Sequence, residues 1–234
     1  MPTVLITGAN RGLGLGFTKH YLSHHWRVIA TCRDQNAASD LMALKNQYTE
    51  NLTVLSLDVS EDESIAAFKD QLGNTPLDLF INNAGIYGPK DGVSAVLGST
   101  NYEAWRAVME VNVYGTQKMV EATLDNVRGG GQKKIVIISS KMGSMTDNTS
   151  GGQYIYRSSK AAVNAIMRSM AADLAGDGIS VASFHPGWVR TDMGGPNGLI
   201  NVDESIAGMT KVIEDLTPNN SGQFWNYDGE NIGW

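Results

Sequence analysis

Cysteine is nearly absent from this chain of 234 residues, which contains only Cys32. A framework of intramolecular disulfides is therefore excluded. The longest unbroken apolar run, Ile135 to Ile138, is far shorter than the stretch of about 20 residues that a membrane-spanning helix needs. The first residues do not join a basic segment to a long apolar stretch, so no signal peptide is expected. These features favour a soluble, cytoplasmic protein.

Charge is also scarce, because charged residues make up 18% of the chain, below the roughly 25% typical of globular proteins. The 18 basic and 24 acidic residues give a net charge of −6, which argues against nucleic acid or an anionic membrane as the main partner. The histidines do not have metal-ligand spacing with carboxylates or Cys32, so no metal site is expected.

Glycine, by contrast, is plentiful with 26 residues, which indicates many tight turns. Short apolar runs alternate with longer stretches of helical pattern, and this alternation predicts a parallel sheet with crossover helices. The expected strands are 4–6, 28–30, 52–57, 77–81, 135–138 and 179–184, with a seventh edge strand at Phe224 and Trp225. The expected helices are 12–24, 37–48, 61–72, 101–127, 153–175 and 203–215.

No linker divides the chain, so we expect a single doubly wound α/β domain over residues 1–234. Ligands of such sheets bind beyond the carboxyl ends of the strands. A glycine-rich turn, Thr7 to Gly14, follows the first strand and opens a helix. Gly8 permits the tight turn, Gly12 lets a pyrophosphate approach, and Gly14 lets the helix pack closely on the sheet. The helix N-terminus attracts the same anion.

The end of the second strand indicates which dinucleotide binds. An NAD site usually has an acidic residue there for the ribose hydroxyl, but Cys32 occupies the corresponding place and Arg33 follows it. A guanidinium suits a 2′-phosphate, and Arg11 in the glycine turn could reach the same group. This pattern favours NADP(H). The alternatives are that Arg33 is a surface charge paired with Asp34, or that Asp34 turns toward a ribose and favours NAD.

Candidate catalytic groups follow the later strands. Tyr156 and Lys160 are four residues apart, which places them on one helix face, and a nearby ammonium lowers the pKa of a phenol. Ser139 and Ser140 end the strand at 135–138, where a hydroxyl could bond a substrate oxygen. Asn112 lies in an apolar helix, an unfavourable position unless its side chain bonds locally or has a function.

Taken together, these motifs resemble the short-chain dehydrogenase/reductase family over essentially the whole chain. The matching segments are Thr7 to Gly14, Asn82-Asn83-Ala84-Gly85, Ser140 with Tyr156 and Lys160, and Pro186-Gly187. Residues 148–152, 156–160, 185–195 and 226–229 resemble the sniffer-type carbonyl reductases and the C-factor-like signalling proteins more closely. Ser140 and Tyr156 are sixteen residues apart, further than in most members, because residues 147–152 lengthen the loop between them; Ser139 stays an alternative to Ser140.

The resemblance implies a Rossmann-type, mainly parallel seven-stranded sheet of order 3-2-1-4-5-6-7 with helices on both faces. It implies an NADPH-dependent carbonyl reductase in which Asn112, Ser140, Tyr156 and Lys160 are catalytic. In this interpretation Tyr156 is the proton donor, Lys160 lowers its pKa and holds a ribose, and Asn112 positions a water. The residues expected to bind the cofactor are Gly8, Asn10, Arg11, Gly12, Leu13, Arg33, Asp58, Val59, Asn83, Ala84, Gly85, Tyr156, Lys160, Pro186, Gly187, Val189 and Thr191.

Two other functions fit the same motifs. The chain could be an NAD-dependent alcohol dehydrogenase, or a signalling protein that keeps the dinucleotide fold. The expected partner is a small carbonyl or alcohol substrate. The resemblance also implies a homodimer through the helices at 101–127 and 153–175, although burial on the sheet would explain their apolar faces equally well.

Overall fold

The fold is seen in a computed structural model that describes residues 1–93 and 95–234. Seven strands form one sheet in the order β3-β2-β1-β4-β5-β6-β7, and every neighbouring pair is parallel. This confirms the predicted strand order, and the sheet is entirely parallel rather than mainly so. The strands are β1 (Thr3–Ile6), β2 (Arg27–Cys32), β3 (Leu52–Ser56), β4 (Leu79–Asn82), β5 (Lys134–Ile138), β6 (Ser180–His185) and β7 (Phe224–Asn226).

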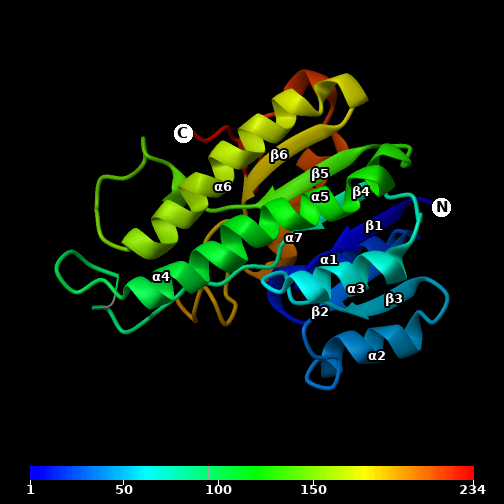
Figure 1. Cartoon of the computed structure of the whole chain (residues 1–234), viewed down its shortest axis with the longest axis horizontal. Coiled ribbons are helices and arrows are strands. Elements are labelled where there is room, and N and C mark those ends of the chain that lie inside the picture. The colour runs from blue at the N-terminus through cyan, green and yellow to red at the C-terminus, as the bar shows by residue number, and fades with distance from the viewer. Residues whose placement is uncertain (94) are drawn as a thin grey trace.

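Helices cover both faces of the sheet (Figure 1). They are α1 (Gly12–Ser23), α2 (Ser39–Gln47), α3 (Asp62–Leu72), α4 (Tyr102–Met109), α5 (Gly115–Arg128), α6 (Tyr154–Asp173) and α7 (Val202–Glu214). Short 3₁₀ turns lie at Lys141–Gly143, Ala175–Asp177 and Pro218–Asn220. Among the described helices, none is both long and apolar enough to cross a lipid bilayer.

The core has two layers because neighbouring residues of a strand point to opposite faces of the sheet. Val4 and Ile6 of β1 pack with α1, α2 and α7 on one face, whereas Leu5 packs with α3, α5 and α6 on the other. Strands buried on both faces lack polar alternation, which explains the continuous apolar run in β5.

The predicted helix at 101–127 differs from the observed structure in one respect. A π-helical turn at Glu110–Tyr114 separates α4 from α5. Thr116 donates its hydroxyl hydrogen bond to the carbonyl of Asn112 within this region. Gly115 then lies so close to Val59 that an added Cβ would be 2.8 Å from the Val59 carbonyl oxygen. The irregular turn carries Asn112, and π turns occur often at functional sites.

Candidate active site

A cavity of about 710 Å³ opens at the carboxyl edge of the sheet. It is lined by segments that follow β4, β5 and β6, together with the start of α6 and Leu13 of α1. Among the predicted site residues, those that line it are Leu13, Ser140, Tyr156, Pro186, Gly187, Val189 and Thr191. The remaining predicted residues, which belong mainly to the glycine turn and the ends of β2, β3 and β4, lie outside its lining.

The glycine turn has the geometry of a cradle for a phosphate. Gly8 and Gly12 have positive φ values of 65° and 53°, which glycine adopts without strain. A Cβ on Gly14 would collide with the carbonyl oxygen of Gly8. Among the described residues, no side chain caps the N-terminus of α1, which begins after Arg11. Its first N–H groups are thus free for an anion, and these residues fit a dinucleotide diphosphate.

Asn83 holds the glycine turn in place. Its side-chain amide donates hydrogen bonds to the carbonyl oxygens of Thr7, at 2.9 Å, and Gly8, at 3.1 Å. The backbone N–H groups of Asn83 and Ala84 both donate to the Thr7 hydroxyl at 3.0 Å. A Cβ on Gly8 would be 3.0 Å from the Cα of Ala84. The segment after β4 therefore stabilises the conformation of the glycine turn through these hydrogen bonds.

The residues predicted to select the cofactor, at the end of β2, differ in their exposure to solvent. Cys32 is buried at the end of β2, and Arg33 and Asp34 are exposed. Within the described part of the chain Arg33 makes no ion pair, so the pair with Asp34 is not formed. Asp34 accepts a hydrogen bond from the backbone of Asn36.

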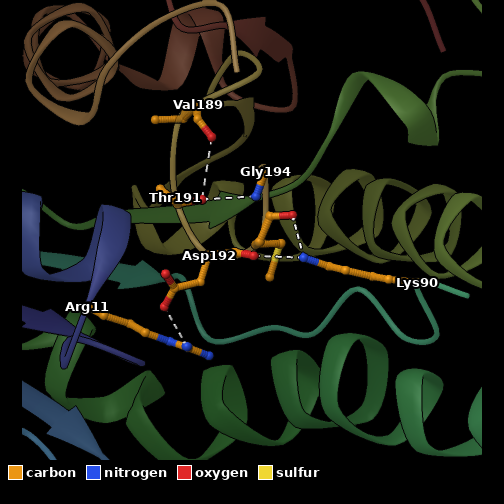
Figure 2. Close-up of polar contacts among 7 residues, drawn as sticks. Arg11, Lys90, Val189, Thr191, Asp192 and Gly194 are labelled. Atoms are coloured by element: carbon orange, nitrogen blue, oxygen red, sulfur yellow. Dashed lines mark hydrogen bonds and ion pairs between the residues drawn. The ribbon is translucent and has the colours of Figure 1, made fainter. Parts of the chain in front are cut away.

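Arg11 is engaged by a loop that is distant in sequence. Its guanidinium forms a 2.7 Å ion pair with Asp192 in the segment after β6 (Figure 2). Lys90 donates hydrogen bonds to the carbonyl oxygens of Asp192, at 2.7 Å, and Met193, at 2.9 Å. Three segments thus meet beside the glycine turn. Because both members of the ion pair are largely exposed, its net stabilisation is small.

Other residues predicted to bind the cofactor contact neighbouring parts of the chain. The Asp58 carboxylate accepts hydrogen bonds from the N–H and hydroxyl of Ser60, and Asn10 is half-buried in the glycine turn. Gly187 has a φ of 84°, and a Cβ there would be 2.5 Å from Ile200. The Thr191 hydroxyl accepts a hydrogen bond from Gly194, which shapes the loop that follows β6.

Ser140 and Tyr156 line the cavity, and Lys160 lies beside Tyr156, outside the lining. The Ser140 and Tyr156 hydroxyls share a side-chain hydrogen bond, and the Ser140 hydroxyl accepts another from the backbone of Met142 at 3.2 Å. Lys160 Nζ lies 5.7 Å from the centre of the Tyr156 ring and donates to the carbonyl of Ile138 at 2.9 Å. Ser139, in contrast, is buried and its hydroxyl has no partner among the described residues. The geometry therefore favours Ser140 over Ser139.

Burial is the largest influence on the pKa values of both Tyr156 and Lys160. It raises the pKa of Tyr156 above its ordinary value, and the Ser140 hydrogen bond offsets part of that rise. Burial lowers the pKa of Lys160 to about 8. Burial therefore sets the direction of the Tyr156 shift, and the expected lowering of that pKa by the Lys160 ammonium stays a prediction.

Asn112 joins the segment after β4 to α6. Its side chain accepts a hydrogen bond from the N–H of Ile86 at 2.8 Å, and donates to the Ile86 carbonyl at 2.9 Å and to the Ser159 hydroxyl at 3.1 Å. A Cβ on Gly85 would be 3.2 Å from the Asn112 amide oxygen and 3.6 Å from Lys160 Nζ. Asn112 and Lys160 thus flank Gly85, where a Cβ would require the Asn112 side chain to shift by a few tenths of an ångström.

Sequence reasoning missed several residues of the cavity. The Tyr87 ring lies 4.5 Å from the Tyr156 ring, centre to centre, and Arg157 and Lys141 belong to the lining. Arg157 and Lys141 directly follow the predicted catalytic residues Tyr156 and Ser140, and this adjacency is the one sequence feature that could have indicated their place in the cavity. Lys90 and Asp192 carried no local signal, since only the fold brings them together.

Comparisons with known proteins agree with this arrangement. Residues 2–198 match the model of the short chain dehydrogenase family. The chain is 39% identical to C-signal of Myxococcus xanthus, over 72% of this chain and 99% of that protein. The structure of the carbonyl reductase Sniffer of D. melanogaster is similar, with a TM-score of 0.91, 32% identity and complete coverage of both chains. The NADPH-bound carbonyl reductase from chicken fatty liver has a TM-score of 0.90 and 34% identity, covering 100% of this chain and 99% of its own. The chain therefore belongs to the short-chain dehydrogenase family.

Proposed function

We propose that this oxidoreductase reduces aldehyde or ketone carbonyls with NADPH. The observation that carries the proposal is the buried Tyr156 phenol, hydrogen-bonded to Ser140 within a cavity at the carboxyl edge of the sheet. The carbonyl reductases of similar structure, one of them bound to NADPH, support the same reaction. When bound, NADPH supplies the hydride that reduces the carbonyl carbon and becomes NADP⁺.

Each of the four predicted catalytic residues has a role in this proposal. Tyr156 donates a proton to the carbonyl oxygen, and its raised pKa keeps that proton in place at neutral pH. Ser140 donates a hydrogen bond to the same oxygen as negative charge develops there. Lys160 stabilises the phenolate left after proton transfer, and Asn112 fixes the backbone beside Lys160.

The cofactor would lie from the glycine turn to the loop after β6. The free N–H groups of α1 would hold the diphosphate, and Thr191 and Val189 would hold the nicotinamide end. Arg11 and Arg33 would bind the 2′-phosphate, since a guanidinium matches the geometry of a phosphate. Arg11 can exchange Asp192 for that phosphate at little cost, because exposed ion pairs contribute little.

The test is the replacement of Tyr156 by phenylalanine. Proton-transfer catalysis contributes roughly 10²–10⁴-fold, so we expect Tyr156→Phe to lose reductase activity by about that factor. NADPH affinity, followed by fluorescence titration, should change little. Consumption of NADPH with a panel of aldehydes, ketones and quinones is the activity readout, with NADH measured in parallel. A Tyr156→Phe enzyme that keeps full turnover would exclude Tyr156 as the acid.

A signalling function is the second candidate, and similarity to C-signal favours it. The complete set of Asn112, Ser140, Tyr156 and Lys160 argues for catalysis. Absence of turnover with every carbonyl tested, together with tight dinucleotide binding, would favour the signalling function. Turnover with NADH but not NADPH would instead favour an NAD-dependent alcohol dehydrogenase.

A further inference from the structure

The cavity above Tyr156 has a local charge opposite to that of the whole chain. Its lining includes three basic residues, Lys90, Lys141 and Arg157, and one acidic residue, Asp147. The whole chain has a net charge of −6. A cleft with an excess of positive charge attracts anionic ligands.

Two of the three cations already have strong partners. Lys141 forms an ion pair with Asp147 at 3.1 Å. Lys90 donates to the carbonyl oxygens of Asp192 and Met193 (Figure 2) and so secures the loop after β6. His185 adds no positive charge at neutral pH, because burial, assisted by Lys141, lowers its pKa to about 4.

Arg157 is the half-buried one of the three cations, whereas Lys90 and Lys141 are exposed. Arg157 follows Tyr156 directly on α6. Its guanidinium donates to the Ser150 hydroxyl at 2.9 Å and, more weakly, to the Met142 carbonyl at 3.4 Å, and both acceptors are neutral. Its Nε is buried and has no partner in the described part of the chain. Arg157 forms no ion pair with a carboxylate there.

The position of Arg157 relates it to the reacting group. Its charge acts on Tyr87, whose pKa it lowers against the larger rise caused by burial. The Tyr87 ring packs on the Tyr156 ring. Arg157 and Tyr156 also line the same cavity, so one molecule in that cavity can contact both the guanidinium and the Tyr156 phenol.

We infer that the preferred substrates are aldehydes or ketones that also carry a carboxylate. Arg157 binds the carboxylate by charge-assisted hydrogen bonds, while the carbonyl oxygen lies against Tyr156 and Ser140. This inference rests on the proposed function. The carboxylate takes no part in the hydride and proton transfer, so the redox balance is that of the proposed reduction.

The test compares two probes that share the same aromatic aldehyde, 4-formylbenzoate, whose para group is charged, and its neutral methyl ester. The readout is the ratio of their kcat/KM values with NADPH, because a general disturbance of the site lowers both values and cancels in the ratio. Hydrogen bonds to charged groups correspond to about ten-fold or more. We expect the wild-type ratio to favour 4-formylbenzoate by about that factor.

Variants assign the preference to Arg157. Arg157→Gln should remove most of the preference for 4-formylbenzoate, mainly by weakening the binding of this probe and so raising its KM. Arg157→Lys should retain part of the preference.

Asp147→Asn should raise the ratio, because it releases Lys141 from its ion pair. Arg168→Gln is the matched control, since Arg168 is an exposed residue of the same helix whose guanidinium donates to the Gly222 carbonyl. Its ratio should equal that of the wild type.

Two outcomes would overturn the inference while the proposed function stands. One is turnover of the methyl ester with a wild-type ratio near or below one, and the other is an unchanged ratio in Arg157→Gln. Failure of both probes and of every other carbonyl would instead contradict the proposed function. Binding then decides the inference: calorimetry should detect 4-(hydroxymethyl)benzoate binding to the NADP⁺-saturated protein about ten-fold more weakly after Arg157→Gln. Equal affinity would refute the carboxylate site.

Discussion

The Lys160 ammonium lies where its charge is costly. It is buried, and its hydrogen bond is to the neutral carbonyl of Ile138. Its pKa is consequently lowered to about 8, against about 10.4 for an unperturbed lysine. The charge that would stabilise a Tyr156 phenolate is therefore present at neutral pH and is lost as the pH rises through about 8.

This protonation predicts the pH dependence of the reductase. We expect kcat/KM for carbonyl reduction to be constant from about pH 6.5 to 7.5 and to fall above pH 8, because Lys160 becomes neutral while Tyr156 keeps its proton. Initial rates at saturating NADPH across pH 6 to 10 measure this. The descending limb should be missing in Lys160→Met, which should have low activity throughout. A wild-type profile that stays flat to pH 9.5 would contradict the role of Lys160.

Arg33 offers the clearest test of cofactor choice. It is exposed and makes no ion pair within the described residues, so its replacement disturbs no such pair. We expect Arg33→Ala to weaken NADPH binding about ten-fold and to leave NADH binding nearly unchanged. Fluorescence titration with both dinucleotides measures the difference, and Arg27→Ala, an exposed arginine at the other end of β2, is the control. Equal weakening of both dinucleotides would remove Arg33 from the 2′-phosphate site.

At the scale of elements, close packing between α6 and the 3₁₀ turn after β5 sets the geometry of the proposed catalytic residues. Gly143 of this turn lies against the backbone of Lys160, and a Cβ on Gly143 would be 2.7 Å from the Lys160 carbonyl carbon. Ser140 begins the same turn. The spacing between Ser140, Tyr156 and Lys160 therefore depends on the absence of a side chain at residue 143.

This contact predicts the effect of a single methyl group. Gly143→Ala should push the turn away from α6, reduce kcat by more than ten-fold and destabilise the fold by about 1–3 kcal/mol, the usual cost of overpacking. Gly176→Ala is the matched control, because nothing lies within 4 Å of a Cβ at that position. Thermal unfolding and turnover measured on both variants test the prediction. A Gly143→Ala enzyme with wild-type kcat would show that the turn can move away from α6 without a loss of activity.

At the scale of the whole molecule, the outer face of α4 and the π-helical turn is unusually aromatic. A groove of about 520 Å³ lies there, lined by Tyr102, Trp105, Arg106, Met109, Glu110 and Tyr114. Tyr102 is 65% exposed and Tyr114 is 51% exposed. Contiguous exposed apolar surface of this kind often marks a protein contact, which agrees with the homodimer that the family resemblance implies.

We therefore expect the protein to sediment as a dimer at micromolar concentration. Tyr114→Glu should shift it to a monomer, because a carboxylate would lose its water on burial in the contact. Leu199→Glu is the control, since Leu199 is 75% exposed in the loop after β6, away from these helices. Sedimentation velocity of the three proteins gives the answer. A wild-type monomer would contradict the expected dimer, and a dimer in all three proteins would place the contact elsewhere.

The sequence predicted much of this protein because the relevant signals are local. Apolar runs and helical periodicity indicated the strands to within a few residues, and the family motifs implied their order. The glycine turn and the pair Tyr156 and Lys160 could be recognised because each is a short segment with fixed spacing. The choice between Ser139 and Ser140 was not local, since it depends on which hydroxyl the packing of α6 turns toward Tyr156.

The sequence alone thus determined the order of the elements and the set of chemical groups at the sheet edge, because backbone periodicity and turn geometry are properties of neighbouring residues. Only the tertiary structure decided how those groups are tuned. Burial raises the pKa of Tyr156 and lowers that of Lys160, and distant segments join Arg11 to Asp192. Desolvation and charge pairing depend on every element packed around a group, and no local pattern specifies them.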